Sequence, residues 1–340
     1  MSERKIRVAV LGVGDFGCNH VRVYRGLEEA ELVGIVDEDA ERARQVAAEF
    51  STHVLPDAEA ILGRVDAVSL AVPTVEHARL GCWLLERGID VLVEKPIASS
   101  LAEADELIQA ARRGGCVLQV GHLERFNPAI EAVQKILTRP MFFEVHRLGV
   151  FSPRSLDVDV VYDVMIHDLD IVLALVEGQV AEVKAVGIPV LTDKVDIAHA
   201  RIEFESGAVA NLTASRVSTE RVRKMRFFQE HEYISIDYTR QDALRVRVKP
   251  ATCGEPAAAG RTTAGGPQPQ FGFEKLETHP EEPLRAELRA FLHAVRSRTT
   301  PRVDGLAGRR ALELASRVMA GILEHARRVQ LAVLAPQAAP

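Results

Sequence analysis

The sequence is poor in cysteine and has no long hydrophobic run. Its four cysteines, Cys18, Cys82, Cys116 and Cys253, are scattered and show no CxxC spacing. A disulfide framework and a structural zinc site are therefore disfavoured, and a reducing cytoplasm is the expected compartment. No apolar run reaches about eighteen residues, so we expect no membrane span. The N-terminal MSERKIRVAVLG leads directly into a strand pattern, so we expect no secretory signal either.

An excess of positive charge is also missing. Lys and Arg number 42 against 48 Asp and Glu, which gives a formal net charge of −6. Charge alone therefore does not bring this chain onto nucleic acid. The apolar share of 47% is that of an ordinary globular protein, and 340 residues suit two domains better than one.

Short apolar runs alternate with amphipathic stretches in the first third of the chain. This rhythm predicts α/β structure, a doubly wound parallel sheet that helices cover on both faces. We therefore predict a Rossmann domain over residues 1–122. Its strands are expected at 6–11, 32–36, 67–72, 91–93 and 117–120, and its helices from about 18, over 75–87 and from 99 or 100 to about 113.

The pattern changes after about Gly121, where extended segments follow one another without long helices between them. This predicts an α+β domain over residues 123–330 with an open, mostly antiparallel sheet. The strands are expected at 142–150, 183–187, 197–204, 209–215, 223–228 and 233–237, and the helices at 163–176, 281–298 and 306–328. A flexible loop is expected at 250–270, rich in Ala, Gly, Thr and Pro, and a flexible tail at 331–340.

A glycine-rich turn, GVGDFG, joins the first predicted strand to a helix. In a dinucleotide site Gly12 permits the tight turn, Gly14 lets the backbone approach a pyrophosphate, and Gly17 allows close helix packing. The amides near Asp15 and Phe16 then lie at a helix N-terminus, which favours an anion. A turn without any ligand is the alternative for such a motif by itself.

Asp37 ends the second predicted strand, twenty residues after Gly17. A carboxylate there accepts hydrogen bonds from the ribose hydroxyls of an adenosine and repels a 2′-phosphate, and no Arg follows immediately to neutralise one. The alternative is a solvated Asp in a turn. Together with the glycine turn, Asp37 predicts NAD rather than NADP.

Three further motifs complete a family resemblance. The chain resembles the glucose–fructose oxidoreductase and inositol dehydrogenase family, known as Gfo/Idh/MocA, over nearly its whole length. The motifs besides GVGDFG are AVPTVEH at 71–77, VEKP at 93–96 and DVMIHDLD at 163–170. The resemblance implies an NAD-dependent oxidoreductase in which Lys95, Asp163 and His167 are catalytic.

The resemblance also implies a set of residues beside the cofactor. We expect Pro73, Thr74, His77, Glu94 and Lys95 to contact it, although a packed role is the alternative for His77. The Pro after Lys95 fixes the local backbone and is compatible with a cis bond.

The spacing of the third motif agrees with a catalytic role. Asp163, His167 and Asp170 share one face of the expected helix, and a carboxylate one turn from His167 favours the imidazolium form. In the expected reaction His167 takes the hydroxyl proton, Lys95 stabilises the alkoxide, and Asp163 orients the base or a neighbouring hydroxyl. The alternative is a polar outer face with a locally satisfied His. No metal is predicted, since one His and two carboxylates without further ligands make a weak site.

The substrate follows from resemblance to one branch of the family, the nucleotide-sugar 3-dehydrogenases. That branch implies oxidation at the 3-position of a sugar such as UDP-N-acetylglucosamine. We expect Arg125, Asn127, Arg154, Asp163 and His167 to bind substrate, because Arg forks suit a diphosphate.

Several other functions remain open at this point. A dehydrogenase of a free polyol or simple sugar, an NAD-dependent glycoside hydrolase and a non-catalytic NAD-binding regulator are the alternatives. We expect a small-molecule partner, no nucleic acid and no membrane. An uncovered sheet face also predicts a homodimer or homotetramer.

Overall fold

The computed structural model describes residues 4–152, 158–249 and 270–331. These residues form two compact units. The first contains residues 1–127, 155–173 and 281–320, and the second contains residues 128–154, 174–280 and 321–340. The segment 155–173, which carries Asp163 and His167, therefore packs with the N-terminal residues. The expected boundary at residue 122 stays a prediction.

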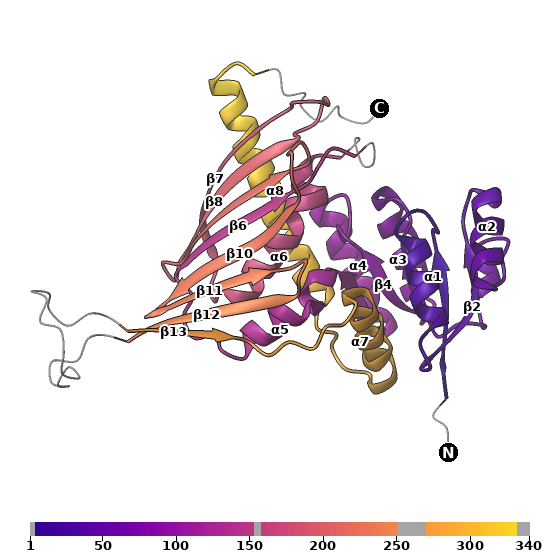
Figure 1. Cartoon of the computed structure of the whole chain (residues 1–340). Helices are drawn as coiled ribbons and strands as arrows, with labels where there is room; N and C mark the ends of the chain where they lie inside the picture. The colour runs from indigo at the N-terminus through magenta and orange to yellow at the C-terminus, as the bar shows by residue number, and fades with distance from the viewer. Residues whose placement is uncertain (1–3, 153–157, 250–269, 332–340) are drawn as a thin grey trace, which may run out of the picture. The chain divides into compact units, whose positions relative to one another are not determined.

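The first unit is built on a parallel sheet in the order β2-β1-β3-β4-β5. Figure 1 labels β2 and β4 of this sheet, together with the helices α1 to α4. All four strand pairs are parallel, as expected for alternating strands and helices. The strands are β1 (Ile6–Leu11), β2 (Ala30–Val36), β3 (Ala67–Leu70), β4 (Asp90–Glu94) and β5 (Leu118–Gly121). The helices are α1 (Gly17–Arg25), α2 (Ala40–Phe50), α3 (His77–Leu85), α4 (Leu101–Gly114) and α7 (Pro283–Ser297).

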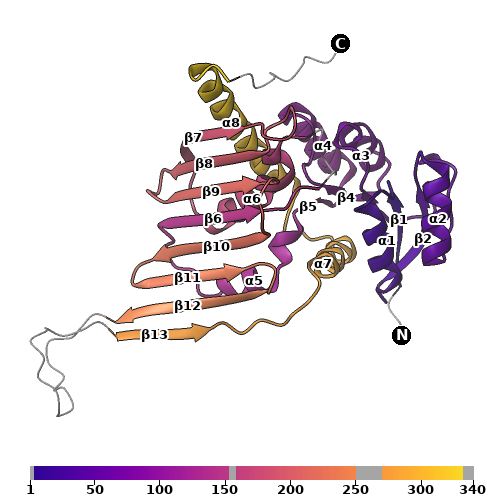
Figure 2. The same cartoon turned by 45° about the horizontal axis from the view of Figure 1, so that its top comes forward.

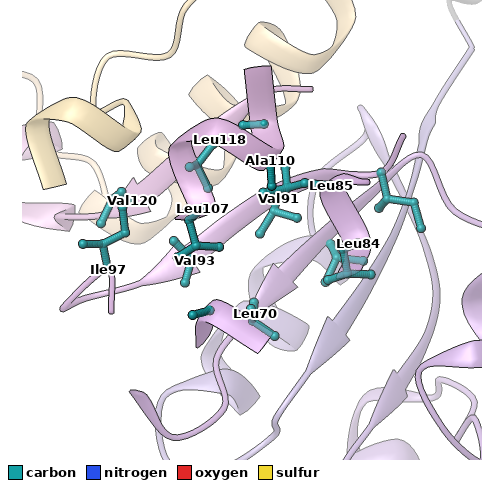
Figure 3. Close-up of a cluster of buried hydrophobic side chains, with 14 of the residues drawn as sticks. Leu70, Leu84, Leu85, Val91, Val93, Ile97, Leu107, Ala110, Leu118 and Val120 are labelled. Carbon is teal, nitrogen blue, oxygen red and sulfur yellow. The ribbon is translucent and has the colours of Figure 1, made fainter. Parts of the chain in front are cut away.

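Separate hydrophobic clusters cover the two faces of this sheet. On one face, Leu84 of α3 and Leu107 of α4 pack with Val91 and Val93 of β4 (Figure 3). On the other face, α1 and α7 pack against the sheet in a cluster that includes Tyr24, Leu92, Val117, Leu288 and Phe291. Because both faces are covered, the strands are mostly apolar, and the loops at the carboxyl edge of the sheet stand on a packed scaffold.

The second unit is an eight-stranded sheet in the order β13-β12-β11-β10-β6-β9-β8-β7 (Figure 2). Every pair is antiparallel except β6–β9, which is parallel. The strands are β6 (Phe142–Leu148), β7 (Val180–Ile188), β8 (Ile197–Phe204), β9 (Val209–Ser215), β10 (Val222–Gln229), β11 (Glu232–Asp237), β12 (Asp242–Lys249) and β13 (Gln270–Lys275). Met225 and Phe227 of β10 are buried while Phe228 is exposed, so one face of this sheet is covered.

The predicted fold class is confirmed, and the differences lie at the ends of elements and in several elements that were not expected. The helix expected at 75–87 begins as a 3₁₀ turn, η2 (Thr74–Glu76), and continues as α3. The helix expected at 163–176 begins as a π-helix, η4 (Val161–Met165), and continues as α6 (Ile166–Leu175). The elements without an expected range are η1 (Glu59–Ile61), η3 (Leu123–Phe126) and α5 (Pro128–Gln134), together with α2, β12 and β13.

The C-terminal region closes on a long helix, α8 (Gly305–Arg328), as the apolar spacing predicts. The expected loop at 250–270 lies outside the described residues except for its last position, where Gln270 begins β13. Of the expected tail at 331–340, only residue 331 is described. Within the described ranges, no helix has the length and apolarity needed to cross a membrane.

Candidate active site

The three motif glycines meet different neighbours. Gly12 has φ +83°, and a Cβ there would lie 2.5 Å from the carbonyl oxygen of Ala71. A Cβ on Gly17 would overlap the carbonyl oxygen of Gly12. At Gly14 the nearest atom to such a Cβ is Arg42 Nη1, at 3.9 Å. The turn is therefore tight at two glycines and open at the third, which is the cradle that a pyrophosphate needs.

Helix α1 begins at Gly17, and no side chain caps its N-terminus at Phe16. The turn follows β1, next to the point where the strand order reverses between β1 and β3. Open α/β sheets bind ligands at such a point, beyond the carboxyl ends of their strands. The position and the open Gly14 therefore fit a dinucleotide.

The carboxylate of Asp37 is held by the backbone. Its Oδ2 accepts a hydrogen bond from Val13 N at 2.6 Å, and its Oδ1 accepts one from Asp39 N at 2.9 Å. Arg42 Nη1 lies 4.0 Å from Oδ1. Sequence reasoning did not single out Arg42. It lies three residues after Asp39, the cap of helix α2, and this spacing could have indicated that its side chain reaches the end of the strand.

His77 links two of the loops at the carboxyl edge of the sheet. Its Nδ1 lies 3.0 Å from the carbonyl oxygen of Pro96, and its Nε2 lies 3.0 Å from that of Val72. Burial lowers the pKa of His77. A neutral ring has one N–H and donates to one of these two carbonyl oxygens, so His77 packs between the segments after β3 and β4 as a structural link. Pro73 and Thr74 lie in the first of these segments, at the start of η2.

Lys95 meets Asp163 inside the first unit. The Lys95–Pro96 peptide bond is cis. Lys95 Nζ donates to the backbone oxygen of Asp163 at 2.7 Å and to its Oδ1 at 3.1 Å. Both side chains are partly exposed, 19% for Lys95 and 30% for Asp163. The two predicted catalytic residues therefore form one charged pair that stays open to a small molecule. A π-helix carries Asp163, and such segments are frequent at functional sites.

Behind this pair, Glu94 occupies a buried position. It accepts from the Lys95 backbone N at 3.2 Å, and its Oε1 lies 3.1 Å from His20 Nε2. A Cβ on Gly121 would lie 2.6 Å from Glu94 Oε1, so Gly121 leaves the room that this carboxylate fills. His20 is fully buried, and its contact with Glu94 lies inside the first unit. The sequence carried no signal for the role of Gly121.

His167 lies on α6 beside a second histidine. The ring centres of His122 and His167 are 6.4 Å apart, with an angle of 84° between the planes. His122 is 1% exposed and follows β5 directly. Sequence reasoning did not single it out. Its place at the carboxyl end of a parallel strand is the signal that could have found it.

The residues expected to bind the diphosphate of the substrate contact other protein residues where the structure describes them. Arg125 Nε donates to Asp170 Oδ2 at 2.9 Å, with side chains only 10% and 2% exposed. Asn127 is buried and donates to Glu124 Oε2 at 3.3 Å. Arg154 lies outside the described residues. Contact of these residues with substrate stays a prediction, and the structure gives Arg125 and Asn127 protein partners.

The comparisons with known proteins match both parts of the chain. Residues 6–122 match the oxidoreductase family with an NAD-binding Rossmann fold. Residues 142–235 match the GFO/IDH/MocA C-terminal domain. A UDP-N-acetylglucosamine 3-dehydrogenase from Acidithiobacillus ferrooxidans is 37% identical over 318 residues, which are 93% of this chain and 97% of that protein.

The chain belongs to the GFO/IDH/MocA oxidoreductase family. Its fold is similar to that of a solved UDP-N-acetylglucosamine 3-dehydrogenase from A. ferrooxidans, with a TM-score of 0.84, 36% identity and coverage of 94% of this chain and 98% of that one. A scyllo-inositol 2-dehydrogenase (NAD(+)) from Bacillus subtilis is 30% identical over 64% of this chain and 69% of its own length. This member of the GFO/IDH/MocA family is thus an NAD-dependent dehydrogenase, as the sequence predicted.

Proposed function

We propose that this dehydrogenase oxidises the 3-hydroxyl of the sugar in a nucleotide sugar, UDP-N-acetylglucosamine. The similarity to the A. ferrooxidans enzyme supports this substrate, because it extends over 93% of the chain and does not stop at the cofactor domain. The observation that carries the chemistry is the Lys95–Asp163 pair, which is partly exposed and lies beside the buried Glu94.

The mechanism follows from the charges of this site. When bound, NAD supplies the acceptor for the hydride. His167 takes the proton of the sugar hydroxyl, and the Lys95 ammonium donates a hydrogen bond to the same oxygen and stabilises its developing negative charge. Asp163 fixes the ammonium with two acceptors, its backbone and side-chain oxygens. Because the Lys95 ammonium is already oriented, it does not have to move when negative charge develops on the substrate oxygen.

The cofactor is proposed to lie along the glycine turn. Gly12, Gly14 and Gly17 with the amides of Asp15 and Phe16 hold the pyrophosphate, and Asp37 accepts from the ribose hydroxyls. The backbone bonds to Asp37 support this role, because they hold the carboxylate in one orientation. Pro73, Thr74, His77, Glu94 and Lys95 then border the nicotinamide half.

Substrate contacts are proposed for Arg125, Asn127, Arg154, Asp163 and His167. For Arg125, the bond to Asp170 offsets the positive charge, so direct contact with the diphosphate would require this pair to open. Its positive charge is held in place without being exposed.

The test is turnover of a panel of hydroxyl substrates, followed by NADH absorbance and product mass. Oxidation of UDP-N-acetylglucosamine with loss of two hydrogens is expected. Turnover of inositol or glucose without turnover of any UDP-sugar would reject the nucleotide sugar, and release of free sugar without net NADH would mean hydrolysis. Lys95→Ala should lower kcat by about 10²–10³-fold. Tyr24→Phe, which removes a buried hydroxyl bonded to Ser69, is the matched control.

A homo-oligomer is proposed from the uncovered face of the second unit. Directly paired residues on that face form an apolar row across neighbouring strands of the sheet in Figure 2, and we call them the aromatic row. Its members are Phe142, Phe228, Tyr233, Val246 and Phe273. Phe273 is 73% exposed and Phe228 is 39% exposed. A second copy of the chain is the proposed cover.

A cytoplasmic location is proposed from the thiols. Cys18, Cys82 and Cys116 are free and partly exposed. Free, accessible thiols suit a reducing compartment. Fractionation of cells that produce the full chain, with a soluble cytoplasmic marker for comparison, tests this location.

A further inference from the structure

A series of contacts inside the first unit joins helix α1 to Lys95, and His20 is its central residue. His20 lies on α1 with no exposed surface, and its Nε2 is 3.1 Å from Glu94 Oε1. The other oxygen of this carboxylate, Oε2, accepts a hydrogen bond from the backbone N of Lys95 at 3.2 Å. One carboxylate therefore contacts a helix with one oxygen and the backbone of the proposed catalytic lysine with the other.

The Glu94 carboxylate depends on donors from the protein. It is only 7% exposed, and a buried carboxylate that loses a hydrogen-bond donor pays a large desolvation penalty. A Cβ on Gly121 of the neighbouring strand would lie 2.6 Å from its Oε1, so the carboxylate fills its space closely. Without the N–H of His20, Oε1 would lose its donor, and we expect the carboxylate to turn and release the backbone of Lys95.

The backbone at Lys95 determines where the ammonium group lies. Lys95 directly follows β4, and its Nζ reaches the backbone oxygen of Asp163 at 2.7 Å and Oδ1 of the same residue at 3.1 Å. A shift of the backbone at the base of this side chain moves the ammonium away from the position in which it meets a substrate oxygen. A misplacement of about 1 Å can cost about a hundredfold in rate.

The two ring nitrogens of His20 have different surroundings. Nε2 meets Glu94, whereas Nδ1 is buried and has no hydrogen-bond partner among the described residues. The ring also stands edge-on to Phe16 of the glycine turn, with ring centres 5.4 Å apart and 65° between the planes. An apolar ring would fill the same space without the cost of an unpaired nitrogen. The contact of Nε2 with Glu94 is therefore what a histidine adds at this position.

We propose that His20 is a positioning residue for Lys95 and acts through Glu94. The proposal rests on the proposed function, in which the Lys95 ammonium stabilises negative charge on the substrate oxygen. His20 donates its Nε2–H to Glu94, and Glu94 holds the backbone of Lys95. Because Phe16 packs against the same ring, the lysine and the turn proposed for the pyrophosphate share one support, which sets the place of the lysine relative to the cofactor.

The first test compares two amides that each keep one nitrogen position. In His20→Gln the amide nitrogen is as far along the side chain as Nε2, and in His20→Asn it is as far along as Nδ1. We expect Gln to keep kcat within about threefold and Asn to lower it by about tenfold to a hundredfold, with little change in KM. Equal kcat in the two variants, or a lower kcat in the Gln variant, would overturn the proposal.

Tyr24→Phe is the matched control for this pair. Tyr24 lies on the same helix and is buried, and its hydroxyl is 2.9 Å from Ser69 Oγ. Loss of this polar atom should lower the thermal unfolding midpoint without changing kcat. A fall in kcat as large as that of His20→Asn would mean that any buried polar loss on α1 disturbs the site, and would overturn the specific role of His20.

The second test is a double-mutant cycle with Glu94→Gln. If His20 acts through Glu94, His20→Asn should lower kcat much less in the Glu94→Gln background than in the unsubstituted chain, because the two residues share one contact. Equal falls in the two backgrounds would show that His20 affects kcat by another route, and positioning through Glu94 would be wrong.

A third measurement does not depend on turnover. Nitrogen-15 NMR of histidine-labelled chain without cofactor reports which ring nitrogens carry a proton, and the His20 signals are assigned by their loss in His20→Gln. We expect His20 to carry a proton on Nε2. A ring with a proton on Nδ1 alone has nothing to donate to Glu94 and would overturn the proposal.

The kinetic outcomes separate this proposal from the proposed function. The assays use the alcohol that the unsubstituted chain oxidises, so a substrate other than UDP-N-acetylglucosamine leaves the comparison intact. If Lys95→Ala keeps full kcat, the catalytic role of Lys95 fails and the positioning role fails with it. If Lys95→Ala lowers kcat while His20→Gln and His20→Asn behave alike, only the positioning role of His20 fails.

Discussion

Single glycines in the cofactor turn have separable tasks. Gly17 is required by the fold, because any side chain there meets the backbone of Gly12. Gly14 is not required by the fold, because its surroundings are open up to the flexible Arg42. If the proposed pyrophosphate lies against this turn, Gly14 is the position at which the ligand and not the fold requires glycine.

Paired substitutions separate the two tasks. Gly14→Ala should leave the thermal unfolding midpoint nearly unchanged and weaken NAD binding by about tenfold or more, measured by calorimetric titration. Gly17→Ala should lower the midpoint and weaken binding together, because α1 must shift. Equal affinity for NAD in Gly14→Ala and the unsubstituted chain would contradict the proposed path of the pyrophosphate.

Glu287 makes stability depend on pH. Its pKa in the folded chain is raised by burial above the ordinary value of 4.5. As pH rises above this value, the unfolded chain releases a proton that the folded chain keeps, so the free energy of unfolding falls. Glu287→Gln should remove this loss and raise Tm more at about pH 8 than at about pH 5, as scanning calorimetry would measure. An equal change in Tm at both pH values would contradict it.

At the scale of elements, the stability of the connection between β7 and β8 also depends on pH, through the carboxylate of Asp196. Asp196 lies there with no exposed surface. Its Oδ2 accepts from the amides of Val190, Leu191 and Thr192 at 2.7, 2.7 and 2.9 Å, and its Oδ1 accepts from Arg216 Nε at 2.8 Å. One carboxylate therefore fixes the connection and ties it to the chain beyond β9.

The pH dependence of this element has the opposite sign to that of Glu287. Burial would raise the pKa of Asp196, but the hydrogen bonds outweigh it and hold the pKa well below the usual value. The stabilisation is present above the unfolded pKa and is lost as pH falls toward the folded one. Asp196→Ala should cost about 3 kcal/mol at neutral pH and weaken the acid sensitivity of unfolding. Asp193→Asn, an exposed carboxylate nearby, is the control in urea titrations from about pH 7 to pH 3.

At the scale of the molecule, described residues of the second unit expose an apolar surface, the face that bears the aromatic row. Phe142 and Phe228 have ring centres 5.9 Å apart, and those of Phe228 and Tyr233 are 5.2 Å apart. Such rings in contact across strands stabilise the sheet and leave apolar area facing water. Burial of that area against a second copy would add favourable free energy.

Sedimentation velocity tests this surface. Phe228→Glu together with Phe273→Glu should shift the chain from oligomer to monomer at micromolar concentration, because charge would be buried without a partner. Leu62→Glu, at an apolar residue 41% exposed in the first unit, is the matched control and should not change the assembly. A monomeric unsubstituted chain, or an oligomer that survives the double substitution, would contradict the proposed face.

The sequence by itself determined the parallel sheet with its glycine turn, the antiparallel sheet, the family and the cofactor. These predictions rest on local patterns in the sequence. The patterns are the spacing of apolar residues, a glycine at a turn with positive φ, and a carboxylate at the end of a strand. The tertiary structure alone decided that Arg125 pairs with Asp170, that His122 stands beside His167, and that Glu287 of α7 is buried near Glu94. Such neighbours are far apart in sequence, and no local pattern encodes their distance. Only the packing of α6 and α7 with the carboxyl edge of the sheet brings them together, and burial then sets their charges.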